Sequence, residues 1–120
     1  FPPFQFLPGL PATRQCATVK RYIDHHYKEN LTLDELAEKV SISKYHMAHA
    51  FKREYGVSPI NYIIDCRIRE GKRLLAETDL APSQIASILG FSSSSYFCKT
   101  FSNKEGTSPT ECRKANQVKF

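Results

Sequence analysis

The sequence lacks the features by which several classes of protein are recognised. None of its apolar runs approaches the roughly 20 residues that a membrane-spanning helix needs, and no signal peptide is visible. It contains no phosphate-binding glycine loop, no G-x-S-x-G motif, no pair of carboxylates placed for catalysis and no metal-ligand set. We therefore expect a cytoplasmic protein that is not an enzyme, does not enter a membrane and uses no cofactor.

The four cysteines form no recognisable pattern. Cys16, Cys66, Cys98 and Cys112 stand far apart, with no C-x-x-C pair and no metal-ligand spacing to the histidines. By their number they could form disulfides. We expect reduced thiols instead, because cysteine is an ordinary small core residue and nothing else in the sequence indicates secretion.

The four histidines offer only part of a metal site. His46 and His49 lie three residues apart and could supply half of one, to which His25 and His26 could add. No carboxylate or thiol stands at ligand spacing near them. We expect no bound metal, and we predict that His25, His26 and His46 are solvated or packed at the surface.

Acidic residues are outnumbered. The chain has 17 Lys and Arg against 12 Asp and Glu, a formal net charge of +5 and a pI near 9.1. An excess of this sign favours a polyanionic partner, either nucleic acid or an acidic membrane surface. Hydrophobic residues make up 41% and charged residues 24% of the 120 residues, which is typical of a chain that folds as one compact domain or as two small subdomains.

The first 13 residues differ from the rest. They contain four of the seven prolines and three phenylalanines, and the first residue is not methionine. We predict a proline-rich linker over residues 1–14, following an N-terminal domain that this sequence does not include. The phenylalanines leave open that the segment docks onto the folded part or onto that domain.

Helical periodicity begins after the linker. Apolar residues recur at helical spacing between about residues 16 and 28, and Asn30 is predicted to close this helix. Thr32 and Glu35 then form a capping box, in which the Thr32 hydroxyl accepts from a free amide while Glu35 reaches back. The apolar face of the helix that follows is made by Leu33, Leu36, Ala37 and Val40.

The sequence contains an internal repeat. Residues Leu36–Pro59 and Ile85–Pro109 follow the same plan, and the second copy has one extra residue in its turn. The matched pairs are Leu36-Ala37 with Ile85-Ala86, Val40 with Leu89, Met47 with Phe97, Phe51 with Phe101, and Gly56-Val57-Ser58-Pro59 with Gly106-Thr107-Ser108-Pro109. The pairs include a small residue where two helices cross, two large residues four apart, and a glycine that ends a helix. Each copy is therefore predicted to be a short helix, a tight turn and a second helix, which is helix-turn-helix geometry.

A longer helix is predicted between the two copies. Residues 59 to about 76 have apolar residues at helical spacing and no proline after Pro59, which gives a rod of about 25 Å. A rod of this length could hold two recognition helices in successive major grooves, whose centres lie about 34 Å apart. We thus predict an all-α fold with a first helix-turn-helix subdomain at 15–58, a linker helix at 59–77 and a second subdomain at 78–116, with a short last helix from Thr110 to Ala115.

The repeat resembles the C-terminal DNA-binding domain of AraC/XylS-type transcriptional regulators. The resemblance covers about residues 16–115 and is most specific in Phe51–Pro59 and in the stretch from Ile85 through Gly90-Phe91 to Pro109. It implies seven helices and a regulator that binds double-stranded DNA near promoters, mostly as an activator that touches RNA polymerase. Two residues depart from the family pattern. Ser41 replaces the usual glycine of the first turn, and Gly71 replaces an alanine of the linker helix, which should weaken that helix by up to about 1 kcal/mol.

The first recognition helix has an outer stripe suited to DNA. With Met47, Ala50 and Phe51 predicted to point inward, the resemblance implies that the base-reading positions are Tyr45, Ala48 and His49. His49 could donate or accept at a base edge, and Tyr45 could contact a thymine methyl group or a phosphate. The predicted phosphate contacts are Ser43, Lys44, Lys52 and Arg53.

The second recognition helix begins in a run of four serines. Such a run is more typical of a flexible linker, but its place after Gly90-Phe91 and before Tyr96-Phe97 favours a helix start, with Ser93 as the N-cap. The base-reading positions implied by the resemblance are Ser94, Ser95, Tyr96 and Lys99. Ser93 and Lys104 are the predicted phosphate contacts. With three small polar side chains, this helix should discriminate less sharply than the first.

Other readings remain open at this point. An all-α repeat can also be a protein-interaction bundle, and repair enzymes attach this kind of module to a catalytic cysteine domain that is not present in these residues. The basic residues of the linker helix are typical of a solvated face, although Arg67 could instead bond to backbone. The regulatory signal is expected to come from the missing N-terminal domain, either a small-molecule sensor or a phosphorylated receiver domain.

Overall fold

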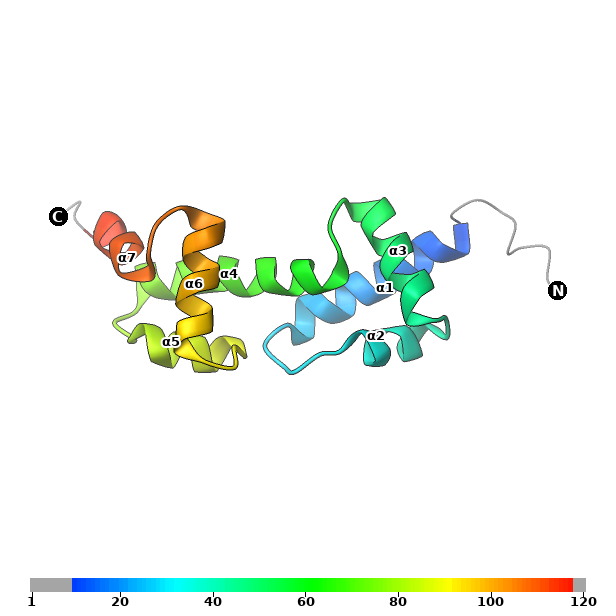
Figure 1. The fold of residues 1–120 in the computed structure, drawn as a ribbon, viewed down its shortest axis with the longest axis horizontal. Helices are drawn as coiled ribbons and strands as arrows, with labels where there is room; N and C mark the ends of the chain where they lie inside the picture. The colour runs from blue at the N-terminus through cyan, green and yellow to red at the C-terminus, as the bar shows by residue number, and fades with distance from the viewer. Residues whose placement is uncertain (1–9, 118–120) are drawn as a thin grey trace. The chain divides into compact units, whose positions relative to one another are not determined.

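The computed structural model describes residues 10–117, with side chains from Arg14 to Asn116. This part of the chain is all α-helical, as predicted, and contains no strand. Its seven helices are α1 (Leu10–His26), α2 (Leu33–Val40), α3 (Lys44–Tyr55), α4 (Pro59–Glu77), α5 (Pro82–Leu89), α6 (Ser94–Glu105) and α7 (Pro109–Gln117) (Figure 1).

The chain divides into two compact units, and the division does not follow the sequence in order. Among the described residues, the first unit comprises residues 10–26 together with Leu31–Ile64, and the second comprises Tyr27–Asn30 together with residues 65–117. Helix α4 is continuous and contributes its first turns to the first unit and the rest to the second. Four residues between α1 and α2 therefore belong to the second unit.

In the first unit, α1 contacts both α2 and α3, and α2 contacts α3. The core contains one or two large side chains from each of these helices. Those at most 1% exposed are Val19, Ile23, Leu36, Met47 and Phe51. Burying each such side chain stabilises the fold by about 1.5–3 kcal/mol. The inward positions predicted for Met47 and Phe51 are confirmed.

The second unit also has a core formed by packed helices. Helix α6 lies against α5, and α7 contacts α6 (Figure 1). Five of its core side chains have no exposed surface, namely Leu75, Ile85, Leu89, Phe97 and Phe101. Gly71 is also buried, and a Cβ placed there would lie 3.2 Å from Leu89 Cδ1 and 3.3 Å from Phe97 Cε1. Glycine at this position of α4 thus leaves room for the packing of α5 and α6.

Helix ends account for most differences from the sequence prediction. Helix α1 begins at Leu10, so residues 10–13, predicted to be extended, are helical. Pro11 is compatible with this because the amides of the first helical turn need no partner within the helix. The same helix ends at His26 rather than near Asn30. Residues 1–9 of the predicted linker lie outside the described part of the chain.

The caps of α2 follow the prediction in part. The Glu35 amide donates to the Thr32 hydroxyl oxygen at 3.1 Å, as expected for an N-cap. The Glu35 carboxylate accepts from the Thr32 hydroxyl at 3.2 Å, rather than from the backbone amide that a capping box would use. At the other end Ser41 adopts a left-handed conformation with φ 58°. A residue with a Cβ is strained in this region by about 1–2 kcal/mol, so the departure from glycine at Ser41 has a physical cost.

Candidate nucleic-acid interface

Helix α3 is held in the first unit by its inner face. The Ser43 hydroxyl oxygen accepts a hydrogen bond from the His46 amide at 3.1 Å and so starts the helix. Met47 and Phe51 have no exposed surface and Ala50 is 2% exposed. Because these three positions fix which side of α3 faces the core, the opposite side is presented to solvent.

The solvent side of α3 carries the predicted DNA-reading residues. Tyr45 is 77% exposed, which is unusual for so large an apolar side chain, and His49 is exposed beside it. Lys52 and Arg53 are exposed, whereas Ala48 is half-buried. An open groove is lined by Ala48, His49, Lys52, Arg53 and Ser58. The structure thus places an imidazole, an ammonium and a guanidinium group along one groove, where their donors can reach an anionic ligand.

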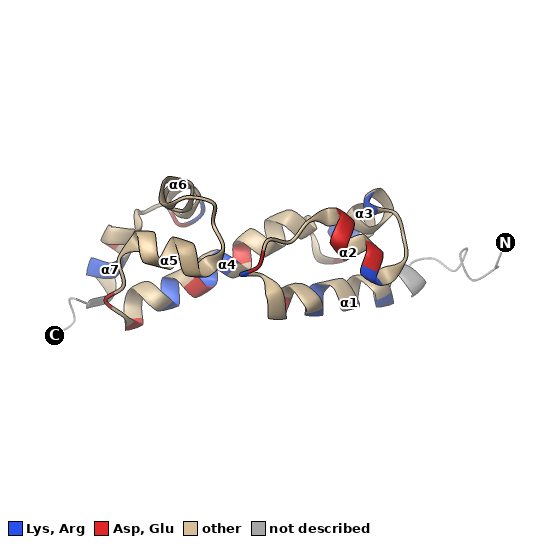
Figure 2. Ribbon diagram, turned by 90° about the horizontal axis from the view of Figure 1, so that it is seen from below, with Lys and Arg blue, Asp and Glu red and all other residues tan. Residues whose placement is uncertain are grey.

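Acidic residues lie close to Lys44, another of the predicted phosphate contacts. Figure 2 shows acidic positions on α2, whose first turn holds Asp34 and Glu35. The Lys44 ammonium lies 3.6 Å from an Asp34 carboxylate oxygen, and both side chains are exposed. Exposed ion pairs of this kind contribute about 0–1 kcal/mol. Lys44 can therefore exchange Asp34 for a phosphate at little cost.

Helix α6 is presented in the same way by the second unit. The Ser93 hydroxyl oxygen accepts from the Tyr96 amide at 3.0 Å, which confirms the N-cap predicted within the serine run. Phe97 and Phe101 are fully buried on the inner side. Of the predicted reading positions, Ser95, Tyr96 and Lys99 are exposed and Ser94 is half-buried.

The two capping serines keep part of their bonding capacity. In Ser43 and Ser93 the hydroxyl oxygen is occupied as an acceptor, but each hydroxyl hydrogen can still be donated. A phosphate oxygen at the start of either helix would accept such a hydrogen. The capping geometry is therefore compatible with the phosphate contacts predicted for both residues.

Lys104 forms an ion pair shorter than that of Lys44. Its ammonium group lies 2.9 Å from an Asp65 carboxylate oxygen of α4. It lines a pocket together with Asp65, Ile68, Arg69, Lys72 and Glu105. Lys104 is thus directed toward α4, and its charge is offset within the protein.

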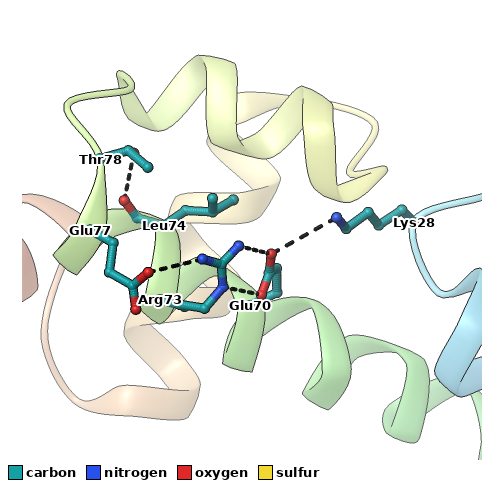
Figure 3. Close-up of polar contacts among 6 residues, drawn as sticks. All are labelled: Lys28, Glu70, Arg73, Leu74, Glu77 and Thr78. Carbon is teal, nitrogen blue, oxygen red and sulfur yellow. Dashed lines mark hydrogen bonds and ion pairs between the residues drawn. The ribbon is translucent and has the colours of Figure 1, made fainter.

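A network on α4 occupies other charged side chains (Figure 3). Arg73 donates to both carboxylate oxygens of Glu70, at 2.8 and 2.6 Å, and to Glu77 at 3.0 Å. The Lys28 ammonium lies 3.9 Å from Glu70. The hydrogen bonds from Arg73 hold the pKa of Glu70 below its usual value. These ion pairs make this face of α4 a less cationic surface than its sequence suggests.

Arg67 is the polar residue whose role the sequence left undecided. Its Nε donates to the Tyr27 carbonyl at 2.6 Å and its Nη2 to the Glu29 carbonyl at 2.8 Å. Burial lowers the pKa of Arg67 from its ordinary value, but an arginine remains charged at neutral pH. The interpretation of Arg67 as bonded to backbone is confirmed. The sequence did not predict that residues 27–30 belong to the second unit.

All four cysteines are free thiols, and burial raises the pKa of Cys16, which keeps it protonated and unreactive. Between residues 10 and 117 no three or more His, Cys, Asp or Glu side chains gather where they could hold a metal ion. In the same part of the chain, no helix has both the length and the apolar character needed to cross a membrane.

Comparisons with known proteins agree with this geometry. Residues 36–115 match the family described as helix-turn-helix domain. The chain is 36% identical over 93 residues to the HTH-type transcriptional regulator YdiP of Escherichia coli, covering 78% of this chain and 31% of that protein. It is 31% identical over 109 residues to the bifunctional transcriptional activator/DNA repair enzyme AdaA of Bacillus subtilis, covering 91% of this chain and 52% of that protein.

Solved structures show the same fold. The C-terminal domain of AraT, a response regulator from Geobacillus stearothermophilus, superimposes with a TM-score of 0.83 and 28% identity, and the match covers 87% of each chain. The aligned residues span 31% of the length of one of these curated relatives and 52% of the other.

Proposed function

Because the chain belongs to the AraC-type helix-turn-helix family of DNA-binding regulator domains, we propose that α3 and α6 each read base pairs in a major groove of one target duplex. The observation that carries the proposal is the exposed stripe of Tyr45, His49 and Lys52 on α3, opposite a fully buried inner face. A large exposed tyrosine flanked by cationic donors has no role in the core. It is suited to base edges, the thymine methyl group and phosphates.

The first unit is the principal reader in this proposal. His49 bonds to a base edge, Tyr45 contacts a thymine methyl group or a phosphate, and half-buried Ala48 lets the helix approach the groove closely. Lys44, Lys52 and Arg53 neutralise phosphates and set the register of α3 without reading sequence. Ser43 donates its hydroxyl hydrogen to a phosphate at the helix start.

The second unit discriminates less sharply. Ser94, Ser95, Tyr96 and Lys99 face the bases, and Lys99 is the residue best suited to the O6 and N7 acceptors of guanine. Ser93 donates to a phosphate. Lys104 takes part only if it leaves Asp65, and because that pair is partly exposed its rearrangement requires little free energy.

In the full-length protein we propose that this module serves a transcriptional activator of the cytoplasm. AdaA is a bifunctional transcriptional activator/DNA repair enzyme, and it aligns with 91% of this chain. An activator bound beside a promoter contacts RNA polymerase, and its activity is set by an effector or by phosphorylation acting on another domain.

A salt titration combined with site selection tests the proposal. Binding sites would be selected from a random duplex library, and the affinity for the selected duplex would be measured between low and moderate salt. We expect two short motifs about one helical turn apart, and an affinity whose logarithm falls with the logarithm of salt concentration at about 0.9 per phosphate contacted. If no duplex bound in low salt, the proposal would fail. A protein-interaction bundle would show instead a partner interface with little salt dependence.

A further inference from the structure

Residues Tyr27–Asn30, which we call the strap, are bound to the second unit through one arginine. Arg67 on α4 donates from Nε to the Tyr27 carbonyl and from Nη2 to the Glu29 carbonyl, at 2.6 and 2.8 Å. The Lys28 ammonium adds an ion pair to Glu70 at 3.9 Å, also on α4 (Figure 3). The guanidinium group of Arg67 therefore binds the strap by its backbone, through hydrogen bonds to two carbonyl groups.

The strap lies directly on the turn that precedes α6. A Cβ placed on Gly90 would be 2.3 Å from the Lys28 carbonyl oxygen and 3.2 Å from Arg67 Nη2. Gly90 also has φ 92°, in the left-handed region. The turn between α5 and α6 thus meets both the strap and the guanidinium group, and only glycine fits at that point.

Aromatic contacts continue from Arg67 to the reading face of α6. The Arg67 guanidinium carbon lies 5.5 Å from the centre of the Phe91 ring, within the range of a cation–π contact. The Phe91 ring contacts Tyr96 edge-on, with centroids 5.5 Å apart. Phe91 is 7% exposed, whereas Tyr96 is 45% exposed. A buried ring is therefore placed between the guanidinium group and an exposed tyrosine.

We propose that Arg67 is a positioning residue for the second recognition helix, acting through Phe91 to fix the Tyr96 ring where it reads DNA. The inference rests on the proposed function, since Tyr96 is one of the base-reading positions assigned there. Arg67 does not touch DNA in this proposal. Its two hydrogen bonds fix the guanidinium plane, the plane supports Phe91, and Phe91 limits the positions open to Tyr96.

Lysine could not replace Arg67 in this role. An ammonium group is a compact charge that can bond to a carbonyl, but it has no planar fork to bridge two carbonyls while a flat face meets an aromatic ring. The role therefore requires the geometry of arginine and not only its charge.

A matched control is present in the same unit. Arg113 of α7 also bonds to backbone, from Nε to the Leu75 carbonyl at 3.0 Å and from Nη2 to the Thr78 and Leu80 carbonyls at 3.0 and 2.6 Å. Removing its guanidinium group takes a hydrogen-bond donor from part-buried backbone carbonyls, as removing that of Arg67 does at the Tyr27 carbonyl. Arg113→Met thus reproduces the loss of stability without altering the contacts around Phe91.

The experiment compares the full chain with Arg67→Met, Phe91→Leu, Arg113→Met and Tyr96→Ala. Each protein is measured under conditions where unfolding curves show it folded. Affinities are measured for the selected duplex and for duplexes that change one base pair at a time. In the unaltered protein a mismatch under a well-placed side chain should weaken binding by roughly 5- to 150-fold. Tyr96→Ala identifies the base pairs that depend on Tyr96.

At those base pairs we expect Arg67→Met and Phe91→Leu to reduce the loss of affinity caused by a mismatch to about threefold or less. Mismatches at base pairs read by α3 should weaken binding as much as in the unaltered protein. Arg113→Met should leave the whole pattern unchanged. The NMR signals of the Tyr96 ring should shift in Arg67→Met, because the Phe91 ring beside it moves, and should not shift in Arg113→Met.

Two results would overturn the inference, and they have different consequences for the proposed function. If Tyr96→Ala changed preference at no base pair, both the proposed reading role of Tyr96 and the inference would be wrong. If Tyr96→Ala flattened preference while Arg67→Met left the pattern of mismatch effects unchanged, as Arg113→Met should, Arg67 would be only a structural residue. The proposed function would then stand without the inference.

Discussion

Replacing Gly90 by alanine probes the contact between the turn and the strap, and Gly106 supplies a control. Both residues have positive φ, 92° and 76°, in the region that a Cβ makes unfavourable by about 1–2 kcal/mol. Their surroundings differ. A Cβ at Gly106 would meet nothing within 4 Å, whereas one at Gly90 would lie 2.3 Å from the Lys28 carbonyl oxygen.

The expected loss in the free energy of unfolding follows from these different surroundings. Gly106→Ala should reduce the free energy of unfolding by about 1 kcal/mol, because alanine also lowers the entropy of the unfolded chain. In Gly90→Ala the strap must also move away, which weakens the two hydrogen bonds from Arg67. Hydrogen bonds to charged groups contribute about 1.5–3 kcal/mol each, so partial loss of both gives a total of about 3–5 kcal/mol.

Urea unfolding followed by circular dichroism would measure both variants. We expect Gly90→Ala to be less stable than Gly106→Ala by at least about 2 kcal/mol at an unchanged denaturant slope. Hydrogen exchange should show faster exchange of strap amides in Gly90→Ala only. Equal losses in the two variants, to within about 0.5 kcal/mol, would refute the close approach of the strap and the turn.

Four further outcomes are expected. Ser41→Gly should stabilise the chain by up to about 1 kcal/mol by removing strain at φ 58°, and a loss of stability in urea would contradict this. His49→Ala should flatten preference at one or two base pairs of the first half-site by about 1–3 kcal/mol each, and an unchanged site selection would show that His49 reads no base. Lys52→Ala should weaken all duplexes alike and lower the salt slope by about one, unlike the exposed α1 control Arg21→Ala, whereas a sequence-dependent loss would assign Lys52 to base reading. Because the pKa of Glu70 is lower in the folded state, its ionised carboxylate stabilises the fold at pH values above the ordinary carboxyl pKa of about 4.3. This stabilisation is lost as the pH falls through the folded-state pKa. Glu70→Gln should therefore flatten the acid limb of the stability curve, and an unchanged acid limb would rule out that contribution.

The internal repeat predicted the helix-turn-helix pairs because its signals are local. Helical spacing placed Met47 and Phe97 inward, and the serine run before α6 placed the cap of that helix at Ser93. Such patterns depend on residues a few positions apart, so the sequence alone contains them. The exposed stripe of α3 follows directly, since the inner face determines the outer one.

Contacts between distant residues could not be predicted in this way. Lys104 was predicted to contact phosphate, and the sequence did not indicate that its ammonium group pairs with Asp65 of α4 in the free protein. Gly71 was expected only to weaken its helix, whereas it makes room for Leu89 and Phe97. A Cβ at 3.2–3.3 Å from both would be tight, so the gain in helix propensity from Gly71→Ala is offset by crowding.

The path of the strap determines whether the two units can be separated. The chain leaves the first unit after His26, contributes four residues to the second, and returns at Leu31. A fragment that starts within α4 would therefore contain Arg67 without the two strap carbonyls that it bonds. A fragment that ends before Arg67 would contain the strap without the guanidinium group that binds it. The two copies look like a tandem duplication, but neither can be exchanged between proteins as one uninterrupted stretch of gene. Any recombination that exchanges the second unit must preserve a four-residue segment encoded within the first.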